Sequence, residues 1–143
     1  MGIRQNLKGK RCYFDTIVFI YLLEGYAVYS SVLNEIRGAI LRQEAEIFTS
    51  DLTLCEALVA PFRLNDMNLV NSYRQLIEHS GAFKLIPTSR ETYIRASLYR
   101  AQMGLKMADA IHVATAVECG CAVFLSNDRA LKLPKGIELV GLK

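Results

Sequence analysis

The sequence predicts an α/β protein, a single domain over residues 1–143 with a central parallel sheet of four to five strands and helices on both faces. Two observations support this fold class. Short apolar runs alternate along the chain with longer segments of helical periodicity, and glycine or proline separates many of these segments. Strands that alternate with helices form parallel sheets with right-handed crossovers, so the carboxyl ends of the strands meet at one edge. We expect any functional site to lie at that edge.

The first part of the chain alternates twice between strand and helix. Residues 11–14 form an expected strand, and residues 16–24 form an apolar helix that ends at Gly25, because glycine tolerates the left-handed conformation of a helix end. Apolar residues at helical spacing predict a second helix over residues 31–43, and a strand follows over residues 45–49.

Proline and glycine divide the middle of the chain. We expect a third helix over residues 52–60 that Pro61 closes, and then an amphipathic helix from Leu69 to near Gly81. A third strand follows over residues 82–86.

The next helix is predicted from its cap and its periodicity. Thr88 or Ser89 is placed to cap a helix in which Ile94, Leu98 and Ala101 form one apolar stripe. Stripes of this kind normally pack on the core of a protein.

The last part of the chain supplies one helix and two strands. After Gly104, residues 106–119 form the most regular helical pattern, with small residues on one face that suit close packing on a sheet. Residues 122–125 are an entirely apolar strand, and residues 138–142 are expected to add a further strand.

Composition limits the class of protein. Hydrophobic residues make up 52% and charged residues 22% of the sequence, as in ordinary folded domains, which argues against a disordered chain. The formal net charge of +3 permits nucleic-acid binding without indicating it. The apolar stretch of residues 17–23 is far shorter than the ~20 residues that span a bilayer, and residues 1–10 are polar and basic. We therefore expect no membrane span, no removed leader and a cytoplasmic protein.

The four cysteines favour buried, reduced thiols over a metal site. Cys12, Cys55, Cys119 and Cys121 all lie in apolar segments, and only the last two are close in sequence. Their Cys-x-Cys spacing, without paired histidines, is not that of a zinc site.

Four acidic residues lie where a strand gives way to a helix or where a helix begins. They are Asp15, Glu56, Asp109 and Asp128. In the expected sheet these residues converge on one edge, where carboxylates in partly buried segments are costly unless a cation offsets their charge. Oxygen ligands without cysteine or paired histidine select Mg²⁺ or Mn²⁺ over zinc. The pattern therefore favours a metal-dependent nuclease.

Taken singly, each acid also has a structural explanation. Asp15 is placed to cap the helix that follows it, and Thr53 and Glu56 match a capping box. Asp109 would complement a helix dipole, and Asp128 would cap a turn. Capping does not explain why apolar runs lead to these acids, and that neighbourhood favours a shared site.

Four stretches of the chain together resemble the motifs of one family. These stretches are Tyr13-Phe14-Asp15-Thr16, Thr49-Ser50 with Leu54-Cys55-Glu56-Ala57-Leu58, Asp109-Ala110-Ile111-His112-Val113-Ala114-Thr115-Ala116 and Leu125-Ser126-Asn127-Asp128. They are similar to the motifs of the PIN-domain ribonucleases, particularly the short VapC-type toxins. The resemblance implies that Asp15, Glu56, Asp109 and Asp128 are catalytic metal ligands. It also implies that water hydrolyses RNA with Mg²⁺ or Mn²⁺, leaving a 5′-phosphate and a 3′-hydroxyl.

The resemblance extends to the neighbours of these acids and to the partners of the protein. Thr16 matches a hydroxyl neighbour of the first acid, Ser126 matches a hydroxyl that steadies the fourth, and Asn127 is placed to supplement or partly replace Asp128. For a toxin, the resemblance implies a homodimer and a cognate antitoxin whose tail covers the acidic edge.

Basic residues near the motifs are candidates for RNA contact, although each is equally an ordinary surface residue. They are Lys10, Arg11, Lys106 and Arg129, with Arg63 and Lys132 as further candidates. His112 shares a helix face with Asp109, so it either orients a phosphate or packs as a structural histidine, and packing is the commoner role.

Alternatives stay open on the same fold. A PIN-domain nuclease of RNA processing that is not a toxin would carry the same motifs, and so would a non-catalytic RNA-binding or interaction module, although the presence of all four acids argues against the module. A haloacid-dehalogenase-like phosphatase is disfavoured, because its nucleophile motif requires a second Asp two positions after Asp15, where this chain has Ile17.

Overall fold

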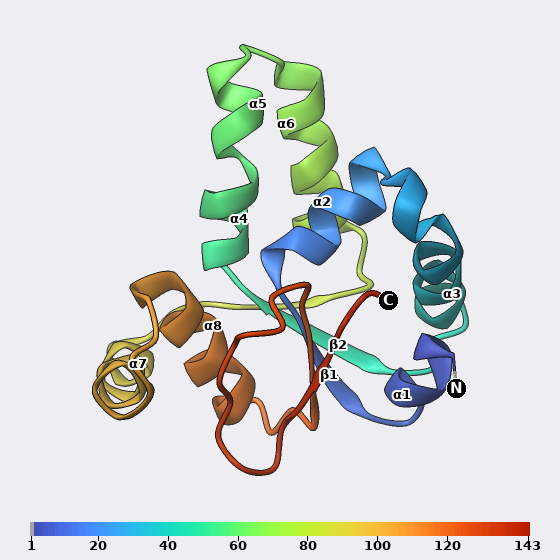
Figure 1. Cartoon of the computed structure of the whole chain (residues 1–143). Helices are drawn as coiled ribbons and strands as arrows, with labels where there is room; N and C mark the ends of the chain where they lie inside the picture. The colour runs from blue at the N-terminus through green and yellow to red at the C-terminus, as the bar shows by residue number, and fades with distance from the viewer. Residues whose placement is uncertain (1) are drawn as a thin grey trace.

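A computed structural model describes residues 2–143 and confirms the α/β class. Five parallel strands form one sheet in the order β3-β2-β1-β4-β5 (Figure 1). The strands are β1 (Arg11–Phe14), β2 (Glu46–Ser50), β3 (Lys84–Ile86), β4 (Val123–Leu125) and β5 (Glu138–Val140). The chain builds the sheet outward from β1 to β3 and then returns to place β4 on the other side of β1. The strand order therefore reverses between β1 and β4.

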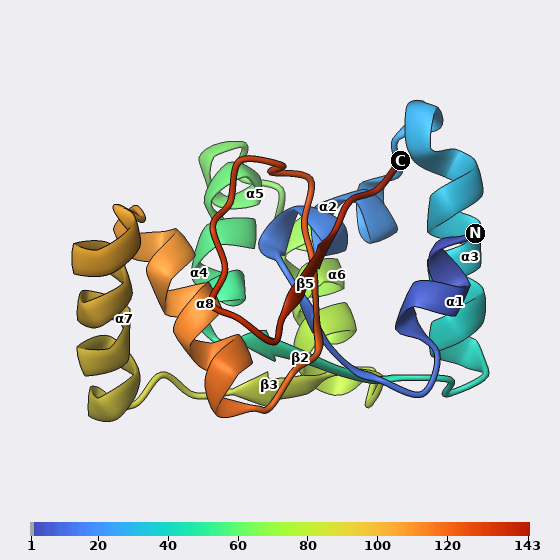
Figure 2. The same ribbon diagram turned by 60° about the horizontal axis from the view of Figure 1, so that its bottom comes forward.

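Helices cover both faces of this sheet. They are α1 (Ile3–Leu7), α2 (Thr16–Glu24), α3 (Ser30–Leu41), α4 (Leu52–Ala57), α5 (Val59–Arg63), α6 (Met67–Arg74), α7 (Arg90–Met103) and α8 (Met107–Glu118), with short helical turns η1 (Ala27–Tyr29) and η2 (Gln75–His79). In Figure 2, α7 and α8 lie on one side of the sheet, and α1 and α3 lie on the other. The hairpin of α5 and α6 projects from the top of the molecule in Figure 1.

Successive residues of β1 face opposite layers, as the alternation of side chains along a strand requires. Cys12 and Phe14 pack with the layer of α1, α2 and α3, whereas Tyr13 packs with α7 and α8. All three side chains are fully buried, and the ring of Tyr13 stacks on Phe124 with 5.0 Å between the ring centroids. The hydroxyl of Tyr13 is therefore enclosed on the α8 side of the sheet.

Most predicted elements are present, with bounds that differ by one or two residues. The structure departs from the prediction at three places. Residues 3–7 form helix α1, which the sequence analysis did not predict. Pro61 lies in the first turn of α5 instead of closing a helix, because N–H groups in that turn have no acceptor within the helix and proline can lack one there without loss. The predicted helix is instead interrupted at Leu58, between α4 and α5. The predicted amphipathic helix ends in the π-helical turn η2.

The apolar stripe of α7 faces solvent, contrary to the usual orientation of such stripes. Ile94 is 56% exposed, Leu98 is 49% exposed, and Ala101 is also exposed. The buried face instead carries Ala96 and Tyr99, because alanine allows close approach to α8 and tyrosine buries a larger side chain. Periodicity therefore identified the helix but not the face that it buries.

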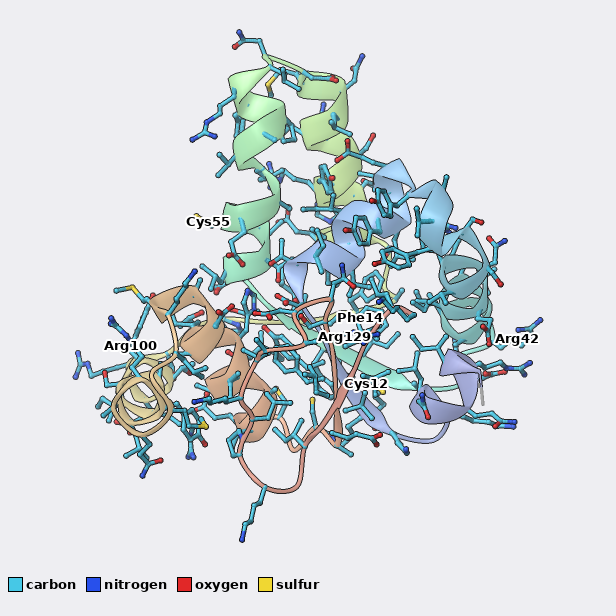
Figure 3. All side chains as sticks on the ribbon, in the orientation of Figure 1. Cys12, Phe14, Arg42, Cys55, Arg100 and Arg129 are labelled. Atoms are coloured by element: carbon cyan, nitrogen blue, oxygen red, sulfur yellow. The ribbon has the colours of Figure 1, made fainter. Side chains whose placement is uncertain are left out.

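All four cysteines are free, as predicted, but they are not all buried. Cys12 and Cys121 are buried, Cys119 is half-buried, and Cys55 is exposed. Figure 3 shows Cys55 on the outer side of α4, away from the centre where Cys12 lies. The prediction was wrong for Cys55 because α4 buries the row of Thr53 and Ala57, and a residue two positions from each points away from that row.

Within residues 2–143, no single helix is long and apolar enough to cross a membrane. Taken together, α2 and the segment Ala27–Leu41 meet the length and composition required of a span, but they are bent by 97°.

Candidate active site

Asp15 and Asp128 flank the point where the strand order reverses. Asp15 follows β1 directly and is the N-cap residue of α2, and Asp128 follows β4. The two strand ends are joined by a 3.0 Å hydrogen bond from the N–H of Asp15 to the carbonyl oxygen of Leu125. In open α/β sheets, ligands bind at this reversal point, outside the carboxyl ends of the strands.

Glu56 and Asp109 reach the same edge from helices. Glu56 lies one turn into α4, which follows β2, and Asp109 lies in the first turn of α8. Burial raises the pKa of Asp109, and the charges of Asp15 and Asp128, with a smaller effect of Glu56, raise that pKa further. The other three carboxylates therefore all lie near enough to act on Asp109, as expected for groups that share one edge.

The four carboxylates fit a divalent cation by their chemistry, although they do not form a closed set of ligands. Among residues 2–143, no three side chains of His, Cys, Asp or Glu stand close enough together to hold a metal ion directly. Mg²⁺ keeps several of its own water molecules and binds through only one or two carboxylates, so the ligands need not all contact it. The acidic edge, defined as Asp15, Glu56, Asp109 and Asp128, offers only hard carboxylate oxygens and concentrated negative charge. The residues fit Mg²⁺ or Mn²⁺ by donor type and charge.

Both carboxylate oxygens of Asp15 are held by hydrogen bonds. Oδ1 accepts from the N–H of Thr16 at 2.8 Å, and Oδ2 accepts from the hydroxyl of Ser126 at 2.7 Å. The Ser126 oxygen in turn accepts from the N–H of Asp128 at 3.1 Å. Ser126 therefore binds the side chain of the first acid and only the backbone of the fourth, whereas the resemblance implied support of the fourth acid.

The carboxylate of Glu56 is fixed through one of its two oxygens. Oε1 accepts from the hydroxyl of Thr16 at 2.7 Å and lies 2.5 Å from Nε2 of His112. Burial alone would raise the pKa of Glu56, but the hydrogen bonds from His112 and Thr16 outweigh burial and lower it. The capping box that the sequence suggested does not form, because Thr53 pairs with the Thr49 hydroxyl instead.

His112 is buried, as the structural reading of the sequence expected, but it also contacts the site. Its exposed fraction is 1%, and Nε2 lies 3.9 Å from Oδ1 of Asp15 in addition to its contact with Glu56. On the other side of the imidazole, Nδ1 lies 2.5 Å from the hydroxyl of Tyr13. The sequence assigned Tyr13 no role beyond its place in the first strand and in the first motif. Its place in an apolar strand indicated that a polar partner lies nearby, because a buried tyrosine usually has a hydrogen-bond partner for its hydroxyl.

The fourth acid has the local role that capping predicts. Oδ1 of Asp128 accepts from the N–H of Ala130 at 3.0 Å, and the residue is exposed. Asn127 is half-buried beside Asp128. That Asn127 supplements Asp128 stays a prediction.

The basic candidates divide between the two edges of the sheet. Lys10 and Arg11 lie at the amino end of β1, opposite the acidic edge, and Arg11 packs over the ring of Phe48 at 4.6 Å. Their predicted position near the acids was therefore wrong, because the length of β1 separates its amino end, where they lie, from its carboxyl end, where Asp15 follows. Lys106 is the N-cap residue of α8, and Arg129 follows Asp128, so only these two of the four main candidates lie at the acidic edge.

A cavity lies at the edge of the sheet opposite the four acids, so the position of the cavity does not indicate the position of the site. The cavity, of about 740 Å³, lies at the amino edge, with Lys10, Ala45 and Lys84 among its lining residues. None of the four acids lines it. We locate the site at the acidic edge, because charge and strand topology converge there.

Fold and site together define an α/β protein with a carboxylate site where its strand order reverses. The PIN domain family matches residues 12–136, and the chain belongs to that family. None of the curated proteins compared with the chain matches it significantly.

Solved structures share the fold at low sequence identity. A toxin–antitoxin complex from Klebsiella pneumoniae is similar with a TM-score of 0.68 and 21% identity, over 92% of this chain and 98% of that chain. VapBC2 from Rickettsia felis, bound to a promoter DNA fragment, has a TM-score of 0.70 and 12% identity over 91% and 97% of the two chains. VapC20 from Mycobacterium tuberculosis, described as a sarcin–ricin loop cleaving toxin, has a TM-score of 0.60 and 16% identity over 79% and 86%.

Proposed function

We propose that this protein is an endoribonuclease that uses Mg²⁺ or Mn²⁺, and that it is the toxin of a toxin–antitoxin pair. The observation that carries the proposal is the convergence of four carboxylates from four separate elements on one edge of a PIN domain. Such a concentration of charge is unfavourable in the folded protein unless a cation binds there. The membership in the PIN domain family supports an action on nucleic acid.

The residues of the acidic edge have distinct roles in this proposal. A bound divalent ion would lower the pKa of a water molecule and neutralise charge that develops on the phosphate. Asp15 and Glu56 present carboxylates that hydrogen bonds already orient, so little freedom is lost when they bind. Asp109 contributes a carboxylate whose charge its neighbours disfavour, and Lys106 would attract the RNA backbone.

A cleavage assay with purified protein tests the nuclease proposal. We expect single-stranded and loop-containing RNA to be cut with Mg²⁺ or Mn²⁺ and to remain intact with a chelator. Asp109→Asn should abolish cutting while circular dichroism shows an unchanged fold. A folded Asp109→Asn variant that cuts RNA at the wild-type rate would contradict the proposal.

The toxin part of the proposal rests on the fold neighbours, which include a toxin–antitoxin complex, VapBC2 and a protein described as a sarcin–ricin loop cleaving toxin. Controlled expression in a bacterial host tests it, with growth arrest expected for the wild type and normal growth for Asp109→Asn. Mapping new 5′ ends in cellular RNA would identify the substrate. Harmless expression of a nuclease that is active in vitro would favour a role in RNA processing.

We also propose a cognate antitoxin and a homodimer as partners. Large apolar side chains are exposed on the α5–α6 hairpin and on α7, and exposed apolar patches commonly mark protein contacts. These residues are Val59, Phe62, Leu64 and Met67 on the hairpin and Tyr93, Ile94 and Leu98 on α7. Light scattering of the purified protein should give the mass of a dimer, and a monomer at all concentrations would remove that part of the proposal.

A further inference from the structure

A buried chain of hydrogen bonds connects the backbone of β2 to the carboxylate of Glu56. The N–H of Ser50 donates to the hydroxyl of Tyr13 at 3.1 Å. That hydroxyl lies 2.5 Å from Nδ1 of His112, and Nε2 of His112 lies 2.5 Å from Oε1 of Glu56. The chain therefore crosses four elements, β2, β1, α8 and α4, before it reaches the acidic edge.

The direction of each hydrogen bond in this chain follows from its first member. A backbone N–H can only donate, so the Tyr13 oxygen accepts from Ser50. The Tyr13 hydroxyl lies 2.5 Å from Nδ1 of His112, which makes that nitrogen the acceptor of its proton. Nδ1 is then unprotonated, so the neutral imidazole carries its proton on Nε2 and donates it to Glu56.

The contacts of Glu56 leave one of its oxygens available. Oε1 accepts from both His112 and Thr16, whereas Oε2 accepts no hydrogen bond from the described part of the chain. A glutamate side chain that is free to rotate would lose conformational entropy on binding a cation. A glutamate fixed through one oxygen has already lost most of that freedom.

We propose that Tyr13 and His112 are positioning residues for Glu56, which hold its Oε1 in place so that Oε2 is free to bind a divalent cation. This inference rests on the proposed nuclease function, because it concerns how one ligand of the cation is held. Hydrogen-bonding partners behind a metal ligand commonly determine metal affinity, and their loss costs about 10–100-fold in affinity or activity.

Tyr73 offers a matched control for the loss of a buried tyrosine hydroxyl. Like Tyr13, it is almost fully buried, and its hydroxyl donates to the carboxylate of Glu24. Glu24 is the last residue of α2, at the opposite end of that helix from Asp15. Tyr73→Phe therefore removes the same kind of hydrogen bond away from the acidic edge.

The test compares Tyr13→Phe, His112→Leu and His112→Gln with the wild type and Tyr73→Phe. Mn²⁺ affinity is measured by calorimetry without RNA, so the result does not depend on cleavage. Nitrogen-15 NMR of metal-free protein reports which imidazole nitrogen of His112 carries the proton. Circular dichroism verifies the fold of each variant.

We expect wild-type His112 to be protonated on Nε2 alone, and Tyr13→Phe to give a mixture of the two tautomers, because Nδ1 has lost its donor. Mn²⁺ affinity should fall about tenfold in Tyr13→Phe and further in His112→Leu. His112→Gln should recover part of that loss, because the glutamine amide offers an N–H donor to Glu56. Tyr73→Phe should bind Mn²⁺ as the wild type does.

Two results would overturn the inference while leaving the nuclease proposal intact. One is a wild-type Mn²⁺ affinity in folded Tyr13→Phe, and the other is a proton on Nδ1 of His112 in the wild type. Should His112→Leu fail to fold, Tyr13→Phe decides the question. A wild-type protein that neither binds Mn²⁺ nor cuts RNA would overturn the proposed function itself, and this inference with it.

Discussion

The hydroxyl of Ser126 donates a 2.7 Å hydrogen bond to Oδ2 of Asp15, and this bond joins the ends of β4 and β1 where the strand order reverses. The other oxygen of Asp15 is held by the N–H of Thr16. The first acid of the site is therefore oriented by groups that the fold itself supplies. Such preorganisation lowers the entropic cost of binding a cation.

Ser126→Ala should weaken metal binding at the acidic edge. Removal of the hydroxyl frees Oδ2 of Asp15, so we expect Mn²⁺ affinity and RNA cleavage to fall by about tenfold. The free energy of unfolding should fall by about 2 kcal/mol, because the hydroxyl also accepts from the N–H of Asp128 and each hydrogen bond usually contributes about 1 kcal/mol. Ser97→Ala is the matched control, because Ser97 is exposed and donates only to a carbonyl oxygen of its own helix α7. Equal Mn²⁺ affinities in the two variants would refute this role of Ser126.

Asp109→Asn should stabilise the metal-free protein although it abolishes activity. The substitution removes a charge that burial, Asp15 and Asp128 all disfavour, so the thermal midpoint in a chelator should rise. Each kcal/mol of relieved repulsion corresponds to about 2–4 °C for a domain near this size. Saturating Mg²⁺ should raise the midpoint of the wild type by mass action and that of the variant far less. A thermal midpoint in chelator that is lower for Asp109→Asn than for the wild type would contradict the proposed repulsion between Asp109 and its neighbouring acids.

The stabilisation by Asp109→Asn should depend on pH in a defined direction. In the unfolded chain Asp109 titrates near its ordinary pKa of about 4, whereas in the folded protein that pKa is raised. The wild type therefore has its full stability below the unfolded pKa and loses part of it as pH rises through the folded pKa. The difference in thermal midpoint between variant and wild type should be smallest near pH 4 and grow as pH rises. A difference that is constant with pH would assign the effect to packing instead.

The sequence predicted the location of the site better than its internal contacts. Asp15 and Asp128 follow apolar runs, and a local pattern of that kind is enough to place a residue at a strand end. The partners of Glu56 are 40 and 56 residues away in the sequence, and only the packing of α4 against α2 and α8 brings them together. Judged from its sequence neighbours alone, Glu56 was best explained as part of a capping box with Thr53. In the folded protein the Thr53 hydroxyl instead pairs with the hydroxyl of Thr49.

The faces of helices were predictable only where burial and hydrophobicity agree. The small-residue face of α8 that was expected to pack on the sheet consists of Ala110, Ala114 and Val117; the two alanines are fully buried and Val117 is half-buried. On α7 the exposed face is the more apolar one, because Ile94 and Leu98 point to solvent while Ala96 faces α8. A helix of a monomer normally buries its most apolar stripe, whereas a helix that contacts a partner protein, as proposed for α7, leaves that stripe exposed in the single chain.

Lys106→Ala and Arg11→Ala should separate RNA binding from fold stability. Lys106 begins α8 at the acidic edge, so its loss should weaken RNA affinity and lower the slope of log affinity against log salt by about 0.7, as expected for one phosphate contact on a single strand. Arg11 lies at the opposite edge, where it donates to the carbonyl oxygen of Cys119 and packs over Phe48. Arg11→Ala should therefore lower the thermal midpoint and leave the RNA affinity and its salt dependence unchanged. Fluorescence anisotropy of labelled RNA in Ca²⁺, over a series of salt concentrations, measures both quantities. A larger loss of RNA affinity for Arg11→Ala than for Lys106→Ala would place the RNA at the wrong edge of the sheet for the proposed reaction.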